Sequence, residues 1–250
     1  MSKIGISNAL EASRLTKNTV ADTVDAIVQE VTSRPPPFNY WTARKLAPDV
    51  IRARQSGIGV ETAVAGAYCM GHPDGYEHNA DVLRHIHQYS DFNGVYIPKI
   101  RNKSNKYATV SPKFLFPFMV GEELVIRTDF LMVQNENPHL VILQPRKGEK
   151  APTREDFRMF ASLFFKATQR SGFKGTEGLI IDVAAPRNAN GRPGKVRKIS
   201  VFPLSIINTM SDADLKEHLS VLAEALRIVR TMDLVIPERP SKHAGEPQGN

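Results

Sequence analysis

Cysteine is almost absent from this chain of 250 residues, which contains Cys69 alone. A single cysteine cannot form a disulfide within the chain, and the apolar stretch around it predicts a buried thiol. The sequence also lacks any run of about eighteen apolar residues, which a membrane-spanning helix needs, and the apolar segment of a signal peptide. These absences predict a cytoplasmic protein with no membrane partner.

Two common catalytic motifs are absent as well. No Gly-x-Ser-x-Gly elbow occurs, which argues against a serine hydrolase of that type. Gly121 precedes a predicted strand, but no Lys-Ser or Lys-Thr follows it as in a phosphate-binding loop. A nucleotide triphosphatase is therefore not expected.

Basic residues outnumber acidic residues, 33 to 26, which gives a formal charge of +7 and favours a polyanionic partner. They gather in three groups, each in predicted turns or at strand ends. The residues predicted to contact nucleic acid are Lys99, Arg101, Lys103, Lys106, Arg146, Lys147, Arg192, Lys195, Arg197 and Lys198. The alternative interpretation is a solvated surface with scattered charge.

The first ninety residues carry helical patterns. Apolar residues from Val20 to Val31 recur on one helical face, and the prolines 35–37 end that helix. Residues 1–34 are therefore predicted to form a helical arm, and residues 38–91 a helical region. Its expected helices cover residues 41–54, with an interruption at Pro48, 60–70 and 77–89.

Strand patterns begin after Gly94. Strands are predicted at 95–100, 123–133, 140–144, 179–184 and 196–202, and the turn at 135–138 joins the second and third into a hairpin. A helix is predicted to start at Thr153 in a capping box with Asp156, and a last helix is capped by Ser211. Residues 92–235 form the predicted core domain, and 236–250 a flexible tail. The expected fold class is α/β (α+β), with a helical N-terminal region followed by a mixed sheet flanked by helices.

Between residues 77 and 203 the predicted order is helix, three strands, helix and two strands. This order resembles the core of the PD-(D/E)XK nucleases, in particular their RecB-like branch. Asp129 matches the family's aspartate in the second strand, whereas Gln144 stands at the position of its second acid and Arg146 at that of its lysine. The resemblance implies a restriction-endonuclease-like core and a site for Mg²⁺ or Mn²⁺.

The two departures change the expected chemistry. Gln144 supplies a neutral oxygen in place of a carboxylate, which weakens the hold on a hard cation. Arg146 cannot give up a proton as a base, but its planar group suits two phosphate oxygens. We therefore expect a nucleic-acid-binding protein, for DNA or RNA, whose nuclease activity is weak or absent.

Acids near the predicted site offer further metal ligands. The resemblance implies that an acid of the helix before the strands, Glu77 or Asp81, completes a cation site with Asp129, and Asp81 is the predicted ligand. Asp81 and His85 also share a helical face, but such a pair is two ligands short of a zinc site. In the plainer interpretation, Asp129 caps or pairs at the rim of the hairpin, and Arg146 and Lys147 are solvated.

Two other functions stay open. The first is a structural or assembly protein, such as a nucleocapsid-like subunit, that forms homo-oligomers or complexes through its N-terminal helix. The second is an active metal-dependent nuclease in which Glu155 or Asp182 replaces the missing acid.

Overall fold

The structure is a computed structural model that describes residues 6, 8–33, 39–92, 94–101, 107–119, 121–146, 151–185 and 196–237. It confirms the predicted α/β class, with helices first and a mixed sheet flanked by helices afterwards. The helices before the sheet are α1 (Ala9–Leu15), α2 (Val20–Thr32), α3 (Trp41–Gln55), α4 (Val60–Val64) and α5 (Tyr76–Gln88). The later ones are α6 (Arg154–Thr168) and α7 (Asp212–Thr231).

Capping residues explain several helix boundaries. The side chain of Thr19 accepts a hydrogen bond from the Asp22 amide at the start of α2, and Ser211 caps α7 in the same way.

The predicted interruption at Pro48 is wrong, because α3 continues through this residue as one helix. The predicted burial of Cys69 is also wrong, because its side chain is exposed.

The described strands form three sheets. β1 (Lys99–Arg101) pairs with β2 (Tyr107–Thr109), and β3 (Lys113–Met119) pairs with β4 (Glu122–Arg127). The third sheet has the order β5, β6, β7, β8, formed by Phe130–Gln134, Asn137–Gln144, Glu177–Asp182 and Ser200–Pro203. β6 and β7 are parallel, whereas β5 and β8 run antiparallel to their neighbours.

Three predicted strands need correction. The strand expected at 123–133 is two strands, because Thr128 and Asp129 interrupt it and β4 and β5 belong to different sheets. The strand expected at 95–100 is reduced to β1, with Tyr96 in an isolated bridge to Val133. The strand expected at 196–202 begins only at Ser200.

The predicted hairpin around residues 135–138 is confirmed as β5 and β6. Asn135 and Glu136 form its two-residue turn with φ values of 48° and 65°, the left-handed conformation that suits the twist of a hairpin. The helix that follows, α6, starts in a capping box in which Thr153 and Asp156 bond each other's backbone amides. Gly178 lets α6 approach β7 closely, since a Cβ atom there would lie 2.9 Å from the Phe164 ring.

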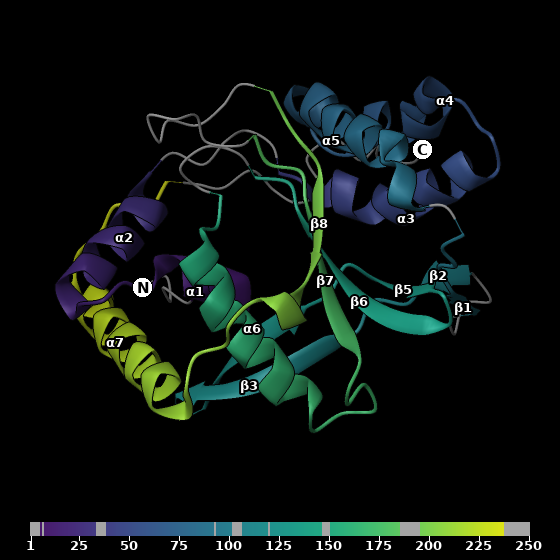
Figure 1. The fold of residues 1–250 in the computed structure, drawn as a ribbon. Coiled ribbons are helices and arrows are strands. Elements are labelled where there is room, and N and C mark those ends of the chain that lie inside the picture. Colours follow the sequence, from purple (N-terminus) through teal and green to yellow (C-terminus); the bar gives the residue numbers. More distant parts are fainter. Residues whose placement is uncertain are drawn as a thin grey trace.

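The four-stranded sheet lies between two helical layers, as Figure 1 shows. Leu140, Ile142 and Ile180 face a core formed with α1, α2, α6, α7 and the β3–β4 sheet. Val141 and Ile181, on the other face, pack against α3, α4 and α5. The ends of β6 and β7 therefore lie between elements from distant parts of the chain.

The predicted N-terminal arm packs onto this core. Ala12 of α1 and Ile27 of α2 are fully buried in the same cluster as α6 and α7.

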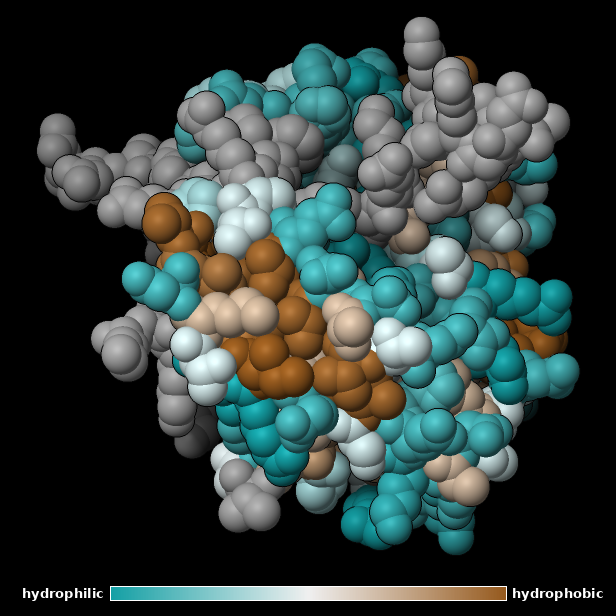
Figure 2. Space-filling view, turned by 90° about the vertical axis from the view of Figure 1, so that its left-hand side faces the viewer, coloured by the Kyte–Doolittle hydropathy of each residue, from teal (hydrophilic) through white to brown (hydrophobic). Residues whose placement is uncertain are grey.

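Several apolar side chains of α2, α7 and the segment after α7 are only partly covered. They include Val28, Val31, Ile228, Leu234 and Ile236. Figure 2 shows a continuous apolar patch on this side of the molecule. Within the described ranges, no helix has the length and apolarity needed to cross a membrane.

Candidate functional site

The fold brings the residues predicted for the nuclease-like site to one end of the four-stranded sheet. Gln144 is the last residue of β6 and pairs in register with Asp182, the last residue of β7. Asp129 immediately precedes β5, and its amide donates to the Val141 oxygen at 2.7 Å. The C-terminal ends of β6 and β7 and the start of β5 therefore lie together at this end of the sheet.

Asp129 is held by other groups of the protein. Its Oδ2 atom accepts a hydrogen bond from the Leu143 amide at 2.6 Å, and Arg44 of α3 forms an ion pair with Oδ1 at 3.3 Å. The Asp129 side chain is 11% exposed. Burial raises the pKa of Asp129, and this effect outweighs the opposite influence of Arg44 and the Leu143 amide.

The other two members of the predicted set point to different partners. Gln144 is buried, and its amide nitrogen donates to the Arg146 backbone oxygen at 3.0 Å. The Arg146 side chain forms an ion pair with Glu11 of α1, where Arg14 is also bound. Arg146 thus helps to hold α1 beside the end of β6.

Asp81 does not join Asp129 through a shared contact. Its carboxylate accepts from the Nε atom of Arg197 at 2.8 Å, and its Oδ1 atom lies 3.5 Å from His85 Nδ1. Among the described residues, no group of three or more His, Cys, Asp or Glu side chains could hold a metal ion. Since both predicted ligands are engaged by arginines, these residues do not fit the Mg²⁺ or Mn²⁺ site that the resemblance implies.

Arg197 needs correction as a predicted nucleic-acid contact, because its side chain is only 1% exposed. Besides Asp81, it donates to the backbone oxygens of Pro145 and Val183 at 2.6 and 2.7 Å and to the Tyr40 hydroxyl at 2.8 Å. These bonds tie the loop ends after β6 and β7 to the helical region. Arg197 therefore stabilises the fold and is not available to a phosphate.

The two acids named as replacements lie in different places. Asp182 accepts from the Ala184 amide at 3.0 Å, and burial raises its pKa to about 6 against the smaller opposing effects of that amide and Arg197. Glu155, on the first turn of α6, pairs with Arg158 instead. Of the two, Asp182 is therefore the one that lies beside Gln144.

The remaining predicted nucleic-acid contacts divide into two sets. Lys99, Arg101 and Lys198 are exposed, although Lys99 lies 3.4 Å from the Asp49 carboxylate. Five predicted contacts lie outside the described residues: Lys103, Lys106, Lys147, Arg192 and Lys195.

The sequence analysis missed the pairing of two basic residues, although Lys113 belongs to the first basic group, which runs from Lys99 to Lys113. Lys113 of β3 and Arg127 of β4 are directly opposite each other, and both are exposed. No described carboxylate pairs with either side chain. The sequence contains a signal for this pair, since an even alternation places Lys113 on the outer side of the Phe114, Phe116 and Phe118 strand. Its partner strand could not be assigned, because residues 123–133 carry the pattern of a single strand.

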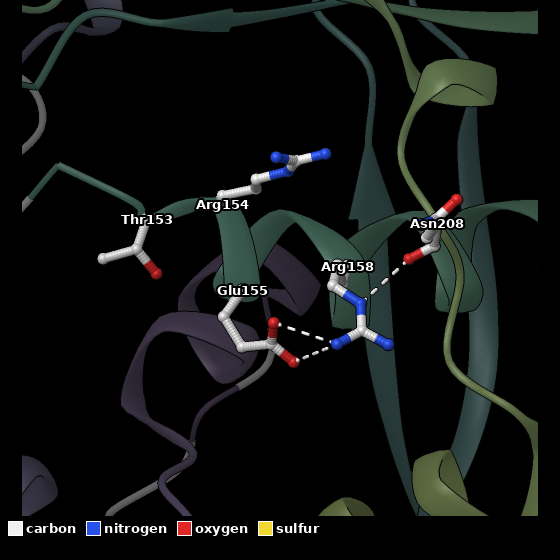
Figure 3. Close-up of a pocket in the computed structure, with 5 residues that line it drawn as sticks. All are labelled: Thr153, Arg154, Glu155, Arg158 and Asn208. Atoms are coloured by element: carbon white, nitrogen blue, oxygen red, sulfur yellow. Dashed lines mark hydrogen bonds and ion pairs between the residues drawn. The ribbon is translucent and has the colours of Figure 1, made fainter.

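A pocket of about 530 Å³ lies at the start of α6. Figure 3 shows its lining residues Thr153, Arg154, Glu155, Arg158 and Asn208. Arg158 donates to both Glu155 oxygens at 2.9 and 3.0 Å and to the Asn208 backbone oxygen at 3.0 Å. The Arg154 guanidinium points away from Glu155. The pocket therefore holds mixed charge, with one carboxylate already neutralised.

Comparisons with protein-family models, with curated proteins and with solved structures find no match for this chain.

Proposed function

We propose that this protein binds nucleic acid through the phosphate backbone and that its nuclease activity is weak or absent. The observation that carries the proposal is a difference between the acidic and the basic residues. The acids are bound by arginines, whereas several basic residues are exposed. Both acids predicted to bind a cation are engaged by arginines, Asp129 by Arg44 and Asp81 by Arg197. Exposed cations such as Lys113 and Arg127 have no described carboxylate partner. Cations of this kind suit contacts with phosphates.

The degenerate PD-(D/E)XK-like core is part of this proposal. It is supported by the β5–β6 hairpin, which starts directly after Asp129 and ends at Gln144, and by α6, which follows the hairpin and packs on the sheet. Replacement of the second acid by Gln144 and engagement of Asp129 by Arg44 both reduce the capacity to hold a cation. A binding role uses the basic surface and does not need that cation.

The test is fluorescence anisotropy with labelled single- and double-stranded DNA and RNA of 20 nucleotides, at 50 to 300 mM salt. Each sample then runs on a denaturing gel after incubation with Mn²⁺. We expect salt-sensitive binding with intact strands. Cleavage that Asp129→Asn or Asp182→Asn abolishes would replace the proposal with the active nuclease, and no binding at 50 mM salt would overturn it.

A second candidate function is assembly, which the apolar patch over α2 and α7 favours (Figure 2). Val235, which follows α7, is 88% exposed. An assembly protein should elute from a sizing column as an oligomer that Val235→Asp weakens. Removal of residues 1–34 is a poor test, because it also removes the buried Ala12 and Ile27 from the core.

A further inference from the structure

The β3–β4 sheet has one buried face and one outer face. Phe114, Leu124 and Ile126 point into the core, whereas Lys113 and Arg127 are exposed on the outer side. On that side the next pair along the sheet is Leu115 with Val125, and Leu115 is 57% exposed. The basic pair therefore stands on a strand surface that the described residues leave open to solvent.

Two like charges face each other in this pair. Directly opposite residues of an antiparallel pair have Cβ atoms about 4.5 to 5.5 Å apart, and like charges at that separation are destabilising. The outer-face carboxylate of Glu123 belongs to a pair four residues farther along β4, about 13 Å away at about 3.3 Å per residue. Asp129, two residues beyond Arg127, is turned inward and bound to Arg44. Neither of these two carboxylates therefore offsets the repulsion between Lys113 and Arg127.

The backbone beside the pair is firmly anchored. The Thr128 hydroxyl donates to the Pro112 oxygen at 2.7 Å, and its amide donates to the same oxygen at 3.2 Å. In return, the Ser111 hydroxyl donates to the Thr128 oxygen at 2.6 Å. These bonds lie one position beyond the two cations and fix the strands that carry them. The anchored backbone keeps the two residues directly opposite each other, so both can reach one anion without a rearrangement of the strands.

We infer that Lys113 and Arg127 form a phosphate clamp, in which both cations contact one phosphodiester group of a bound nucleic acid. This inference rests on the proposed function and locates its contact surface. A phosphate between the two side chains removes their mutual repulsion and accepts hydrogen bonds from both. The guanidinium suits two phosphate oxygens at once, and the ammonium adds a point charge.

The experiment measures the salt dependence of nucleic-acid affinity by anisotropy for the wild type, the double variant Lys113→Gln/Arg127→Gln, and Lys216→Gln. Lys216 is the matched control, because it is exposed on α7 and no described residue pairs with it. In the double variant we expect about 10-fold weaker binding at 50 mM salt. The slope of log K against log salt should be shallower by roughly 0.7 to 0.9 for each phosphate that the variant no longer neutralises. Lys216→Gln should bind as the wild type does.

The outcomes separate the clamp from the proposed function. If the wild type binds and the double variant keeps the same affinity and slope, the clamp is overturned while nucleic-acid binding stands. An equal loss of affinity in Lys216→Gln overturns the clamp too, because net charge alone would then explain it. If poly-glutamate displaces the nucleic acid as well as unlabelled DNA does, phosphate recognition at this pair is contradicted. A wild type that binds no nucleic acid overturns both proposals.

Discussion

Charged side chains gather at the carboxyl ends of β6 and β7 and again on the outer face of β3 and β4, with opposite arrangements. In the first region Asp129 and Asp81 are each bound by an arginine, and Arg197 is almost completely buried. In the second region Lys113 and Arg127 face each other and the solvent. The comparison shows that partners from distant segments determine which charged side chains are engaged and which face the solvent.

The largest effect is expected at Arg197, where the first region depends on one buried side chain. Arg197→Met should lower the free energy of unfolding by about 3 to 5 kcal/mol, because the buried oxygens of Pro145 and Val183 lose their donor. Urea unfolding measures this change. The neighbouring exposed Lys198 is the control, and Lys198→Met should change stability by less than about 0.5 kcal/mol. Equal effects of the two variants would refute the structural role of Arg197.

A second prediction concerns the pH dependence of stability. Burial raises the pKa of Asp182 to about 6 in the folded protein, so ionisation of this group as pH rises from about 4 to about 6 lowers stability. Asp182→Asn should therefore raise the free energy of unfolding at pH 8 by about 1 to 3 kcal/mol, and the gain should vanish near pH 4.

The matched control for this prediction is Asp233→Asn, since Asp233 is an exposed aspartate after α7. Urea unfolding at several pH values should show little change in this control. A gain for Asp182→Asn that is equal at pH 4 and pH 8 would show that charge burial is not its cause.

The smallest effect is expected in the second region. Lys113→Gln should raise the free energy of unfolding by about 0.2 to 1 kcal/mol, because it removes the repulsion with Arg127. High salt should reduce the gain, since ions screen exposed charges. Thermal unfolding at 20 and 500 mM salt measures it against Lys216→Gln. No gain at low salt would mean that the two cations do not interact.

Local signals in the sequence predicted much of the fold. Three features that depend on residues close in sequence were confirmed: the apolar face of α2, the Thr153 capping box and the turn at residues 135–138. The break between β4 and β5 was not predictable from pattern, because Thr128 and Asp129 interrupt an apolar run without glycine or proline. That break depends on hydrogen bonds to Pro112 and Val141, which are distant in sequence.

The candidate site was less predictable, for the same physical reason. Asp129 and Arg44 are 85 residues apart in the chain, and Arg197 and Asp81 are 116 apart. The sequence groups Arg197 with Lys195 and Lys198 because its neighbours are basic, yet folding buries Arg197 against the backbone oxygens of Pro145 and Val183. Charge counts identify basic segments, but only tertiary contacts show which cations stay exposed.

The most direct test of the account compares the two regions in one binding measurement. Nucleic-acid affinity is measured at 50 mM salt, with and without Mn²⁺, for the wild type, Asp182→Asn and the double variant Lys113→Gln/Arg127→Gln. We predict wild-type affinity and intact strands for Asp182→Asn under both conditions, and weaker binding for the double variant. The opposite result is that Asp182→Asn abolishes a Mn²⁺-dependent cleavage or binding step while the double variant behaves as the wild type, and it would contradict the proposed function.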